Sequence, residues 1–411
     1  MPDGFARKFA DHPLKVFRDF RLLFLGRFTS AVGDKFFTIA LSWYVVSHDS
    51  VHNKLHLGLL MAVNLLPVVL FGPVMGTWAD RLNKKHCLMA ADAGRFFFLG
   101  ALAALYYADA LTLPRLYLLC FAISVFVPLF EAAANSALEP LTDGAHLSRA
   151  VAVNASTVQL SSVLGAALGG MFLAALGVGG AFVWNALSYL VSLGCIARIR
   201  ASLVPDASAA RRPYLEEMRE GFAYLRGNAP VRHLLLVFGA VNLFAAPMIL
   251  FIPMIVKFIL KSTVTWVALL ELALSLGAVA MAAALSMASS QTRVYPKIFL
   301  GLVVMGAALL WLAAAPGGTL VLGAVFAFGA GLSLVNALAL GLFQNAVPAP
   351  LKGRFFALLN TVCFAVMPLT FMLNGFVSNI LPLPVVLLIN GAGVVLVSLA
   401  VLAVPRIGDR I

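Results

Sequence analysis

The sequence predicts an all-α membrane protein with twelve transmembrane helices in two six-helix halves, and three observations carry this prediction. The 411 residues are 62% hydrophobic and only 11% charged, whereas about a quarter of the residues in soluble domains are charged. Apolar runs long enough to cross the roughly 30 Å hydrocarbon layer recur along the whole chain. Basic residues gather in alternate connections between these runs, as in multi-pass membrane proteins.

The apolar runs are assigned to helices because a segment that faces lipid must satisfy its own backbone hydrogen bonds. About 20 mainly apolar residues are needed for one crossing. Twelve runs meet this requirement, at residues 22–47, 57–79, 87–107, 113–138, 146–174, 178–199, 232–258, 263–288, 297–315, 318–345, 353–379 and 382–405.

The 29 lysines and arginines predict the orientation of the chain. With the N-terminus inside, 22 of them lie in cytoplasmic segments or at the adjoining span ends, four lie on the outer side in the same sense, and three lie deep within spans. Because cytoplasmic loops retain positive charge, both termini are predicted to be cytoplasmic, in a bacterial inner membrane. The same distribution explains the net charge of +12 through membrane orientation, so no nucleic-acid partner is expected.

The longest polar stretch divides the chain between the sixth and seventh spans. The first apolar run is too long for a cleavable signal, so the residues before it are expected to remain as a cytoplasmic leader. The predicted organisation is a leader (1–21), a first bundle (22–199), a cytoplasmic linker (200–231), a second bundle (232–405) and a cytoplasmic tail (406–411).

Part of the linker, PYLEEMREGFAYLR, is predicted to form an amphipathic helix. Apolar residues recur at helical spacing with charges between them, at Leu215, Met218, Phe222 and Leu225. Such a helix lies either on the cytoplasmic face of the membrane or in solvent between the two halves.

The two halves contain a weak internal repeat. NSALEPLTDGAHLSRA (135–150), between spans four and five, corresponds to QNAVPAPLKGRFFA (344–357), between spans ten and eleven. Each has a proline, a glycine and an arginine that opens the next helix. Internal repeats of this kind are typical of secondary transporters, which bind substrate near the midplane at the repeat interface.

The stretch GPVMGTWADRLNKKH (72–86) is a short charged connection between spans two and three. Gly72 and Gly76 lie four residues apart, a spacing that favours close approach of a neighbouring helix. Asp80 ends the helix, where it is expected to hold one conformation closed by hydrogen bonds or by an ion pair with an arginine. The basic residues that follow are explained by membrane orientation alone.

GTWADRLNKK resembles the loop signature of the major facilitator superfamily, GxxxDRxxRR, with Gly76, Asp80, Arg81 and Lys85 at its positions. Four further stretches resemble the branch that contains macrolide efflux proteins and the enterobactin exporter. They are FRLLFLGRFTSAVGDKFFTIALSWYVV, ALEPLTDGAHLSRAVAVNAS, EEMREGFAYLRGNAPVRHLLL and GRFFALLN. The resemblance implies a twelve-helix transporter that works by alternating access and exports its substrate as protons enter.

Two stretches depart from that pattern. VLGAALGGM (163–171) is similar to the antiporter signature of helix five but lacks its proline. SSQTRVYPK (289–297), the second-half equivalent of the signature loop, has lost most of the signature. These two stretches therefore do not carry the expectation of proton antiport or of a second loop latch.

Ionisable residues inside spans cost about 2.5–3.5 kcal/mol on insertion scales and are therefore functional candidates. Asp34 lies about twelve residues into the first span, where its carboxylate is expected to carry protons or bind substrate; a helix cap or ion pair is the structural alternative. Glu271, in span eight, is the acid expected to serve either purpose in the second half.

Asp92 and Arg95 lie three residues apart in the third span and can neutralise each other. Glu131 in the fourth span is expected at a similar depth. These three residues are predicted to form an intramembrane charge network, either as a gate or as a proton relay, and Glu131 is also a candidate for proton coupling or substrate binding.

Uncharged polar residues within spans are the remaining candidates for lining a substrate cavity. They are Asn64, Gln159, Asn185, Asn242, Asn336, Asn360 and Asn374. His48, His52 and His56 are spaced four residues apart in an outer loop and are expected to be solvated rather than to bind metal. The four cysteines show no metal-binding spacing, so no metal and no cofactor are predicted.

The sequence predicts a secondary transporter that exports an amphipathic small molecule, of the drug or siderophore type, with protons as the coupling ion. A lysophospholipid transporter is the alternative, because FTSAVGDKFF and GTWADRLNKKHCLMAADAGR also resemble that group. The chain lacks the GxxxxGK[ST] motif and any suggestive grouping of nucleophile and base, so neither ATP coupling nor enzymatic activity is expected. Oligomeric state is left open, since this fold needs no partner chain.

Overall fold

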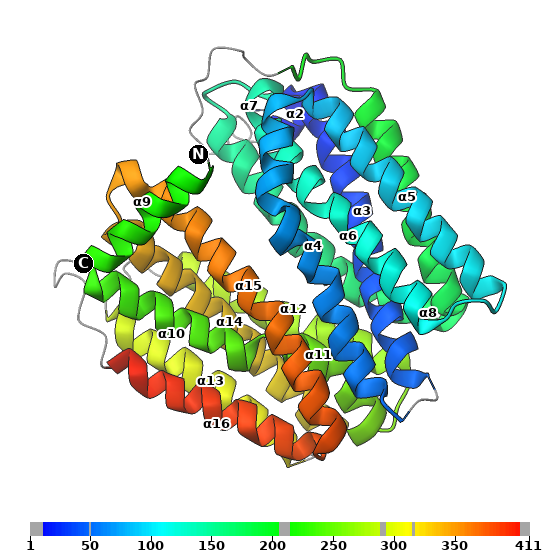
Figure 1. The fold of residues 1–411 in the computed structure, drawn as a ribbon, viewed down its shortest axis with the longest axis vertical. Helices are drawn as coiled ribbons and strands as arrows, with labels where there is room; N and C mark the ends of the chain where they lie inside the picture. The colour runs from blue at the N-terminus through cyan, green and yellow to red at the C-terminus, as the bar shows by residue number, and fades with distance from the viewer. Residues whose placement is uncertain (1–10, 49–50, 205–213, 288–292, 315–316, 403–411) are drawn as a thin grey trace, which may run out of the picture. The chain divides into compact units, whose positions relative to one another are not determined.

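The computed structural model describes residues 11–48, 51–204, 214–287, 293–314 and 317–402. These residues form α-helices joined by short turns (Figure 1). They group into two compact units, one within residues 1–41 and 66–209 and the other within 42–65 and 210–411. The helices α3 (Arg18–Ser47) and α4 (Asn53–Arg81) each contribute to both units, because the boundaries fall inside them.

The first unit contains the helices that surround the site described below. In chain order they are α2 (Pro13–Val16), α3, α4, α5 (Lys84–Tyr107), α6 (Leu113–Ser136), α7 (Leu138–Leu141) and α8 (Leu147–Ala197), of which the end of α3 and the start of α4 belong to the second unit.

The second unit continues with a short amphipathic helix inside the linker and then with long apolar helices. Its helices are α9 (Tyr214–Gly227), α10 (Ala229–Ala245), α11 (Met248–Met254), the π-helix η1 (Ile255–Ile259), α12 (Val264–Met287), α13 (Val294–Ala313), α14 (Gly318–Ala346), the 3₁₀-helix η2 (Ala349–Leu351), α15 (Lys352–Ile380) and α16 (Leu383–Leu402).

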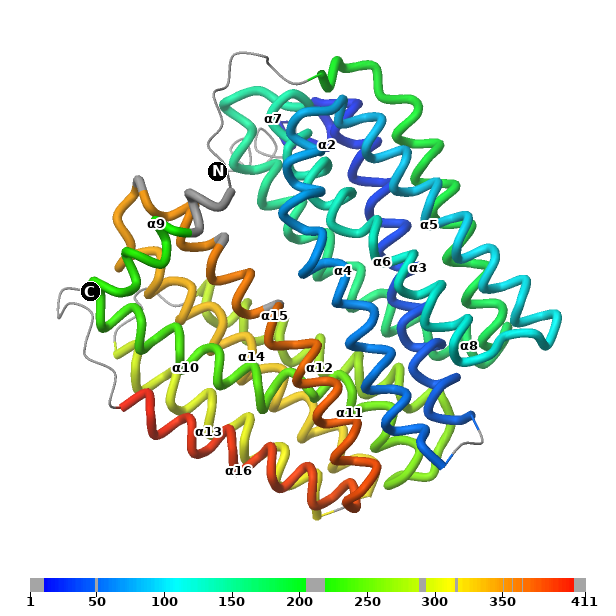
Figure 2. Tube along the Cα trace, in the orientation of Figure 1, coloured from blue at the N-terminus to red at the C-terminus, as the bar shows by residue number. Residues whose placement is uncertain are grey.

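Ten helices among the described residues are long and apolar enough to cross a membrane. One of them, α8, has 51 residues and a break at Gly177, whose φ of +65° lies in the region that favours glycine. Both ends of α8 lie at the same end of the first unit, the end at which α7 also lies (Figure 2). Helix α3 has 30 residues and carries Asp34 and Lys35 within it. If α3 is added to these ten helices and α8 is counted as two spans because of its break, the number of spans is the twelve expected from the sequence.

The core of the first unit lies between α3, α5, α6 and α8. Phe20, Leu88, Phe130 and Ile196 belong to one cluster of buried apolar residues, and each is no more than 2% exposed. Since lipid is as apolar as leucine, such a core stabilises the bundle through tight packing rather than through the exclusion of water.

Helices α12 and α14 of the second unit approach so closely that glycine is required between them. A Cβ atom at Gly277 would overlap the carbonyl oxygen of Phe326 and lie 3.0 Å from the amide nitrogen of Ala330. We expect Gly277→Ala to destabilise the protein by about 1–3 kcal/mol, because the backbone must move to admit the methyl group.

The matched control is Gly323→Ala on α14, where a Cβ atom meets nothing within 4 Å. The control should be neutral or slightly stabilising, since alanine favours a helix by up to about 1 kcal/mol over glycine. Thermal unfolding in detergent measures both variants, and equal melting temperatures would contradict the prediction.

The linker helix α9 forms within the predicted linker and packs against α15. Its Tyr224 hydroxyl donates to the carbonyl oxygen of Ala346 at 3.1 Å, and Glu220 forms an ion pair with Arg354 at the start of α15. Leu225 is buried and Phe222 is half exposed. The side chains of Leu215 and Met218 lie outside the described part of the chain.

Candidate functional site

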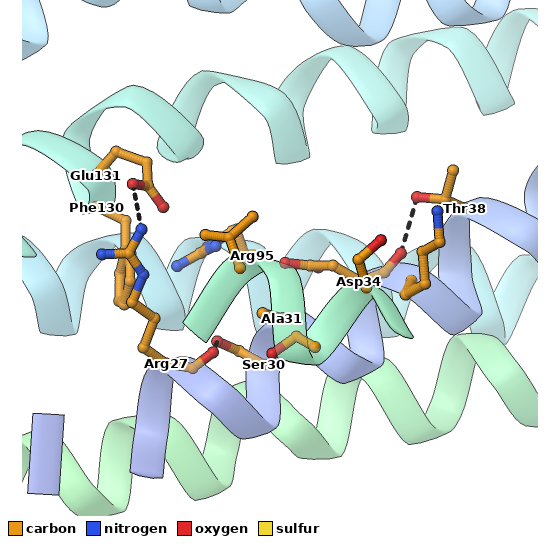
Figure 3. Close-up of a pocket in the computed structure, with 12 residues that line it drawn as sticks. Arg27, Ser30, Ala31, Asp34, Thr38, Arg95, Phe130 and Glu131 are labelled. Carbon is orange, nitrogen blue, oxygen red and sulfur yellow. Dashed lines mark hydrogen bonds and ion pairs between the residues drawn. The ribbon is translucent and has the colours of Figure 1, made fainter. Parts of the chain in front are cut away.

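A cavity of about 280 Å³ lies inside the first unit (Figure 3). Residues of α3, α5, α6 and α8 line it, and most of the lining side chains are charged or carry a hydroxyl. The lining consists of Arg27, Ser30, Ala31, Asp34, Lys35, Thr38, Arg95, Phe130, Glu131, Val158, Ser161 and Ser162.

Asp34 is held at the cavity wall by two donors from the second half of α8. Its Oδ1 accepts hydrogen bonds from the Tyr189 hydroxyl and from Asn185 Nδ2, the latter at 3.1 Å. The Ser188 hydroxyl donates to Asn185 Oδ1 at 3.0 Å, which leaves the amide nitrogen of Asn185 facing Asp34. A Cβ atom at Gly33 would overlap Asn185 Oδ1, so the glycine lets α8 approach closely enough for these contacts.

Arg27 and Glu131 form an ion pair at the other end of the cavity. Arg27 Nη2 lies 2.6 Å from Glu131 Oε2, and Arg27 Nη1 donates to Asn154 Oδ1, also at 2.6 Å. The arginine side chain is 7% exposed, whereas that of Glu131 is 46% exposed. Glu131 is therefore open to the cavity while its partner is fixed by two acceptors.

Arg95 and Asp92 form a second, fully buried ion pair on α5. Arg95 Nη2 lies 2.6 Å from Asp92 Oδ1, and the aspartate side chain has no exposed surface. The guanidinium carbon of Arg95 stacks 4.4 Å from the ring centre of Phe130 and 4.6 Å from that of Tyr189. Asp92 Oδ2 and Arg95 Nε have no hydrogen-bond partner among the described residues, so this pair is only partly satisfied.

Tyr189 joins the two parts of this arrangement. Its hydroxyl donates to Asp34 on α3, and its ring supports the guanidinium of Arg95 on α5. A single side chain therefore links Asp34 to the buried ion pair. The cavity offers bound molecules both cationic and acidic groups and a polar wall.

The sequence predicted Asp34 and Glu131 as separate candidates for proton coupling or substrate binding, and both line this cavity. Glu131 forms its ion pair with Arg27, while Asp92 pairs with Arg95. Glu271 is 4% exposed and belongs to α12 of the second unit.

Of the predicted cavity amides, Asn185 contacts Asp34 directly. Asn242 donates to the carbonyl oxygen of Phe238 in its own helix. Asn374 donates to the carbonyl oxygen of Thr370 in α15 and accepts from Asn390 of α16 at 2.8 Å. Gln159 and Asn360 are exposed, and Asn64 and Asn336 are half-buried.

Sequence reasoning missed Tyr189, Ser188 and Asn154. Asn185 and Tyr189 are one helical turn apart, so they lie on one face of a helix. This spacing is the sequence feature that could have identified Tyr189. Nothing in the sequence shows that this face meets Asp34, since the two segments are separated by about 150 residues.

In the signature loop, Asp80 Oδ1 accepts a hydrogen bond from the Ser136 hydroxyl at the end of α6, at 3.2 Å. Lys85 Nζ donates to the carbonyl oxygens of Ala197 and Ile199, at 2.9 and 2.7 Å. The lysine thereby caps the last turn of α8, a role beyond membrane orientation. Asn83, in the same loop, caps α5 by accepting from the Lys85 amide at 3.0 Å.

Within the first unit, no neighbouring helix approaches Gly72 or Gly76 closely. Apart from the backbone of α4 itself, no described atom of this unit lies within 4 Å of a Cβ atom placed at either glycine. This face of α4 is therefore open within its own unit, and the two glycines are not required by packing there. Arg81, next to Asp80, is exposed.

The predicted outer-loop histidines do not converge on a metal site. Within the described residues, no three metal-ligating side chains come together. His52 Nδ1 lies 2.8 Å from Asn379 Nδ2, and His48 is exposed.

Two relatives are similar over different lengths of the chain. The uncharacterised transporter YfiS of Bacillus subtilis (strain 168) is 31% identical over 180 residues, which are 42% of this chain and 41% of YfiS. The match thus spans less than half the length of that relative. Macrolide efflux protein A of Streptococcus pyogenes is 20% identical over 364 residues, which are 88% of this chain and 89% of that protein.

Among solved structures, a mutant of the nucleoside transporter NupG superposes with a TM-score of 0.74 at 13% identity, covering 95% of this chain and 100% of NupG. That likeness concerns the fold. The family model described as Major Facilitator Superfamily matches residues 23–371, most of the chain. Together with the helical architecture and the charged cavity, this match shows that the chain is a multi-pass membrane protein of the Major Facilitator Superfamily.

Proposed function

We propose that this protein is a secondary transporter that exports an amphipathic small molecule across a bacterial inner membrane by alternating access, with protons as the coupling ion. The observation that carries the proposal is the cavity lined by Asp34, Arg27 and Glu131 inside a transporter fold. The similarity to macrolide efflux protein A along 88% of the chain supports export of a drug-like substrate.

Proton coupling is assigned to Asp34, with Glu131 as the second acid of the same cavity and Glu271 as the candidate in the second unit. A coupling carboxylate must alternate between charged and neutral forms as substrate leaves and enters. Tyr189 and Asn185 both donate hydrogen bonds to Asp34, so they tie its carboxylate to α8. Proton binding at Asp34 is therefore proposed to be linked to rearrangement of the contact between α3 and α8.

The signature loop is proposed to act as a latch on the cytoplasmic side, with both termini on that side. Asp80 supplies the acceptor at the end of α4, and Gly76, Arg81 and Lys85 complete the loop. The contact of Asp80 with Ser136 and the lysine cap on α8 support this role, because they tie α4, α5, α6 and α8 together near one connection.

The test is transport by purified protein in liposomes with an imposed inward proton gradient. Labelled erythromycin, a labelled catechol siderophore and a labelled lysophospholipid are offered separately, with protein-free liposomes and a collapsed gradient as controls. We expect movement of the drug or the siderophore that stops when the gradient collapses.

Movement of lysophospholipid alone, independent of the gradient, would replace the proposal with the flippase alternative. The cavity residue Val158, which is half exposed, is compatible with contact to an acyl chain. The ion pair of Arg27 and Glu131 inside the cavity favours a substrate with polar groups on more than one side.

A further inference from the structure

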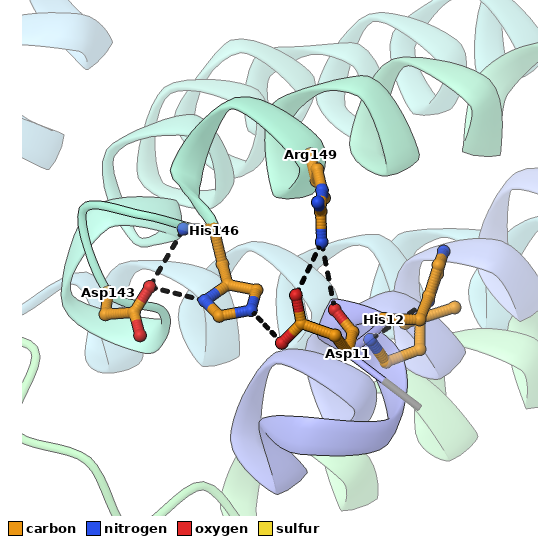
Figure 4. A network of polar contacts seen from close by, with 6 residues as sticks. Asp11, His12, Asp143, His146 and Arg149 are labelled. Carbon is orange, nitrogen blue, oxygen red and sulfur yellow. Dashed lines mark hydrogen bonds and ion pairs between the residues drawn. The ribbon is translucent and has the colours of Figure 1, made fainter. Parts of the chain in front are cut away.

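A cluster of charged residues, none of which lines the cavity, fastens the leader to the start of α8 (Figure 4). Asp11, in the leader, contacts two residues of this cluster. Its Oδ1 lies 2.8 Å from His146 Nε2, and its Oδ2 lies 2.9 Å from Arg149 Nη1. On the other side of the ring, Asp143 Oδ1 lies 2.6 Å from His146 Nδ1. The ring of Phe17 packs edge-on against the imidazole at 5.3 Å between centres.

The geometry favours a doubly protonated imidazole. Each ring nitrogen of His146 faces a carboxylate, and a neutral imidazole has only one N–H to donate. In the neutral form one of the two carboxylates would face a lone pair, and Asp11 and Asp143 would repel each other without a cation between them. The closed arrangement therefore depends on the charge of His146.

The second half of the chain repeats this arrangement without the histidine. Arg149 and Arg354 open corresponding helices in the internal repeat, and each pairs with an acid from the segment that precedes the first helix of its own half. For Arg149 that acid is Asp11, and for Arg354 it is Glu220 on α9. The two halves thus share one acid–arginine contact, and only the first adds a titratable ring.

We propose that Asp11, His146, Asp143 and Arg149 form a pH-sensitive clasp, closed when the side of the membrane that carries the leader is acidic and open when that side is alkaline. As a regulator, the clasp rests on the proposed function: export that imports protons acidifies the cytoplasm, and closure of the clasp then slows further export. The clasp itself depends on no transport activity.

The direction of the pH response follows from the ionisation of His146, Asp11 and Asp143. Hydrogen bonds from Asp11 and Asp143 raise the pKa of His146 above its ordinary value of 6.5. A raised pKa means that the stabilisation is complete below about pH 6.5 and is lost as pH rises through the raised value. His146 and Arg149 lower the pKa of the Asp11 carboxyl, and His146 lowers the pKa of Asp143, so both remain charged throughout this range. His12, next to Asp11, faces the Leu14 amide with its Nδ1.

The test is the distance between spin labels at Val16 and Val151, both about half exposed and on opposite sides of the clasp. The labels are introduced into the full-length protein after replacement of its four cysteines. We expect a narrow distance distribution at about pH 6 and a longer, broader one at about pH 8.5, with a midpoint above 6.5.

Two variants and one control pair decide the outcome. His146→Gln should give the broad distribution at both pH values, and Asp143→Asn should lower the midpoint because one carboxylate no longer stabilises the cation. Labels at Phe222 and Gly353, beside the contact between Glu220 and Arg354, should show no change with pH. A pH-independent distance in the otherwise unsubstituted protein, or the same pH response in His146→Gln, would overturn the clasp.

The regulatory step is measured separately, as the initial rate of erythromycin transport at a constant proton gradient while the pH on the leader side is varied. The protein with native His146 should slow as that side becomes acidic, and His146→Gln should not. Equal pH profiles would overturn regulation by the clasp. Absence of transport in both would refute the proposed function, while the distance measurement would still decide the clasp.

Discussion

Replacing Asp34 with asparagine is expected to reduce gradient-driven export to the level of protein-free liposomes. Asparagine has nearly the same shape and keeps an oxygen that can accept from Tyr189 and Asn185, so the contact between α3 and α8 should survive. What it loses is the ability to bind and release a proton. If Asp34 carries the coupling proton, the gradient then has no means of driving the cycle.

Three further variants make this prediction specific. Tyr189→Phe removes a donor but leaves the carboxylate, so gradient-driven export should persist. Asp109→Asn makes the same chemical change at an exposed loop residue, where φ is +51° and asparagine is tolerated, and should have no effect. Glu131→Gln should weaken export by releasing Arg27 from its ion pair, because the cavity then carries an unpaired cation.

The measurement is efflux of labelled erythromycin from preloaded liposomes against its concentration gradient, driven by the inward proton gradient, with reconstituted protein quantified in each sample. Gradient-driven export by Asp34→Asn at the rate of the unsubstituted protein would remove Asp34 from coupling. The role would then pass to Glu131 or to Glu271, each tested by its glutamine variant in the same assay.

Breaking the buried ion pair of Asp92 and Arg95 is expected to have the largest effect on stability. Arg95→Met leaves the Asp92 carboxylate unpaired in a site with no exposed surface. Removing one partner of a buried pair typically costs about 3–5 kcal/mol, because the remaining charge has lost both water and its counter-ion. Asp92→Asn should destabilise the protein for the same reason, since it leaves the guanidinium of Arg95 buried without its anion.

The double variant Asp92→Asn, Arg95→Met should recover much of this loss, since no unpaired charge remains. Arg18→Met is the matched control, because the Arg18 side chain is 49% exposed and its nitrogen lies 3.7 Å from Asp19. An exposed pair of this kind contributes at most about 1 kcal/mol.

Unfolding of these variants can be followed by the reaction of a thiol dye with the native cysteines, of which Cys120 is fully buried. Heating in detergent exposes the thiol as the bundle opens. If Arg95→Met and Arg18→Met unfolded at the same temperature, the buried pair would not be a main determinant of stability.

The membrane class, the positions of the long helices and the family could all be predicted from the sequence. Composition and the length of the apolar runs are sufficient for the first two, because lipid restricts a spanning segment to a helix. The loop signature was sufficient for the third, since its glycine, aspartate and basic residues occur at fixed spacing within one connection.

The grouping of the polar residues, in contrast, could be read only from the folded bundle. Asp34 meets Asn185 and Tyr189, Arg27 meets Glu131, and Asp11 meets His146, across separations of 104 to 155 residues. In a membrane protein the lipid-facing and protein-facing sides of a helix are both apolar, so the pattern of the sequence does not show which side faces inward. The face that each helix presents is set by close packing, as at Gly33, and this packing exists only in the assembled bundle.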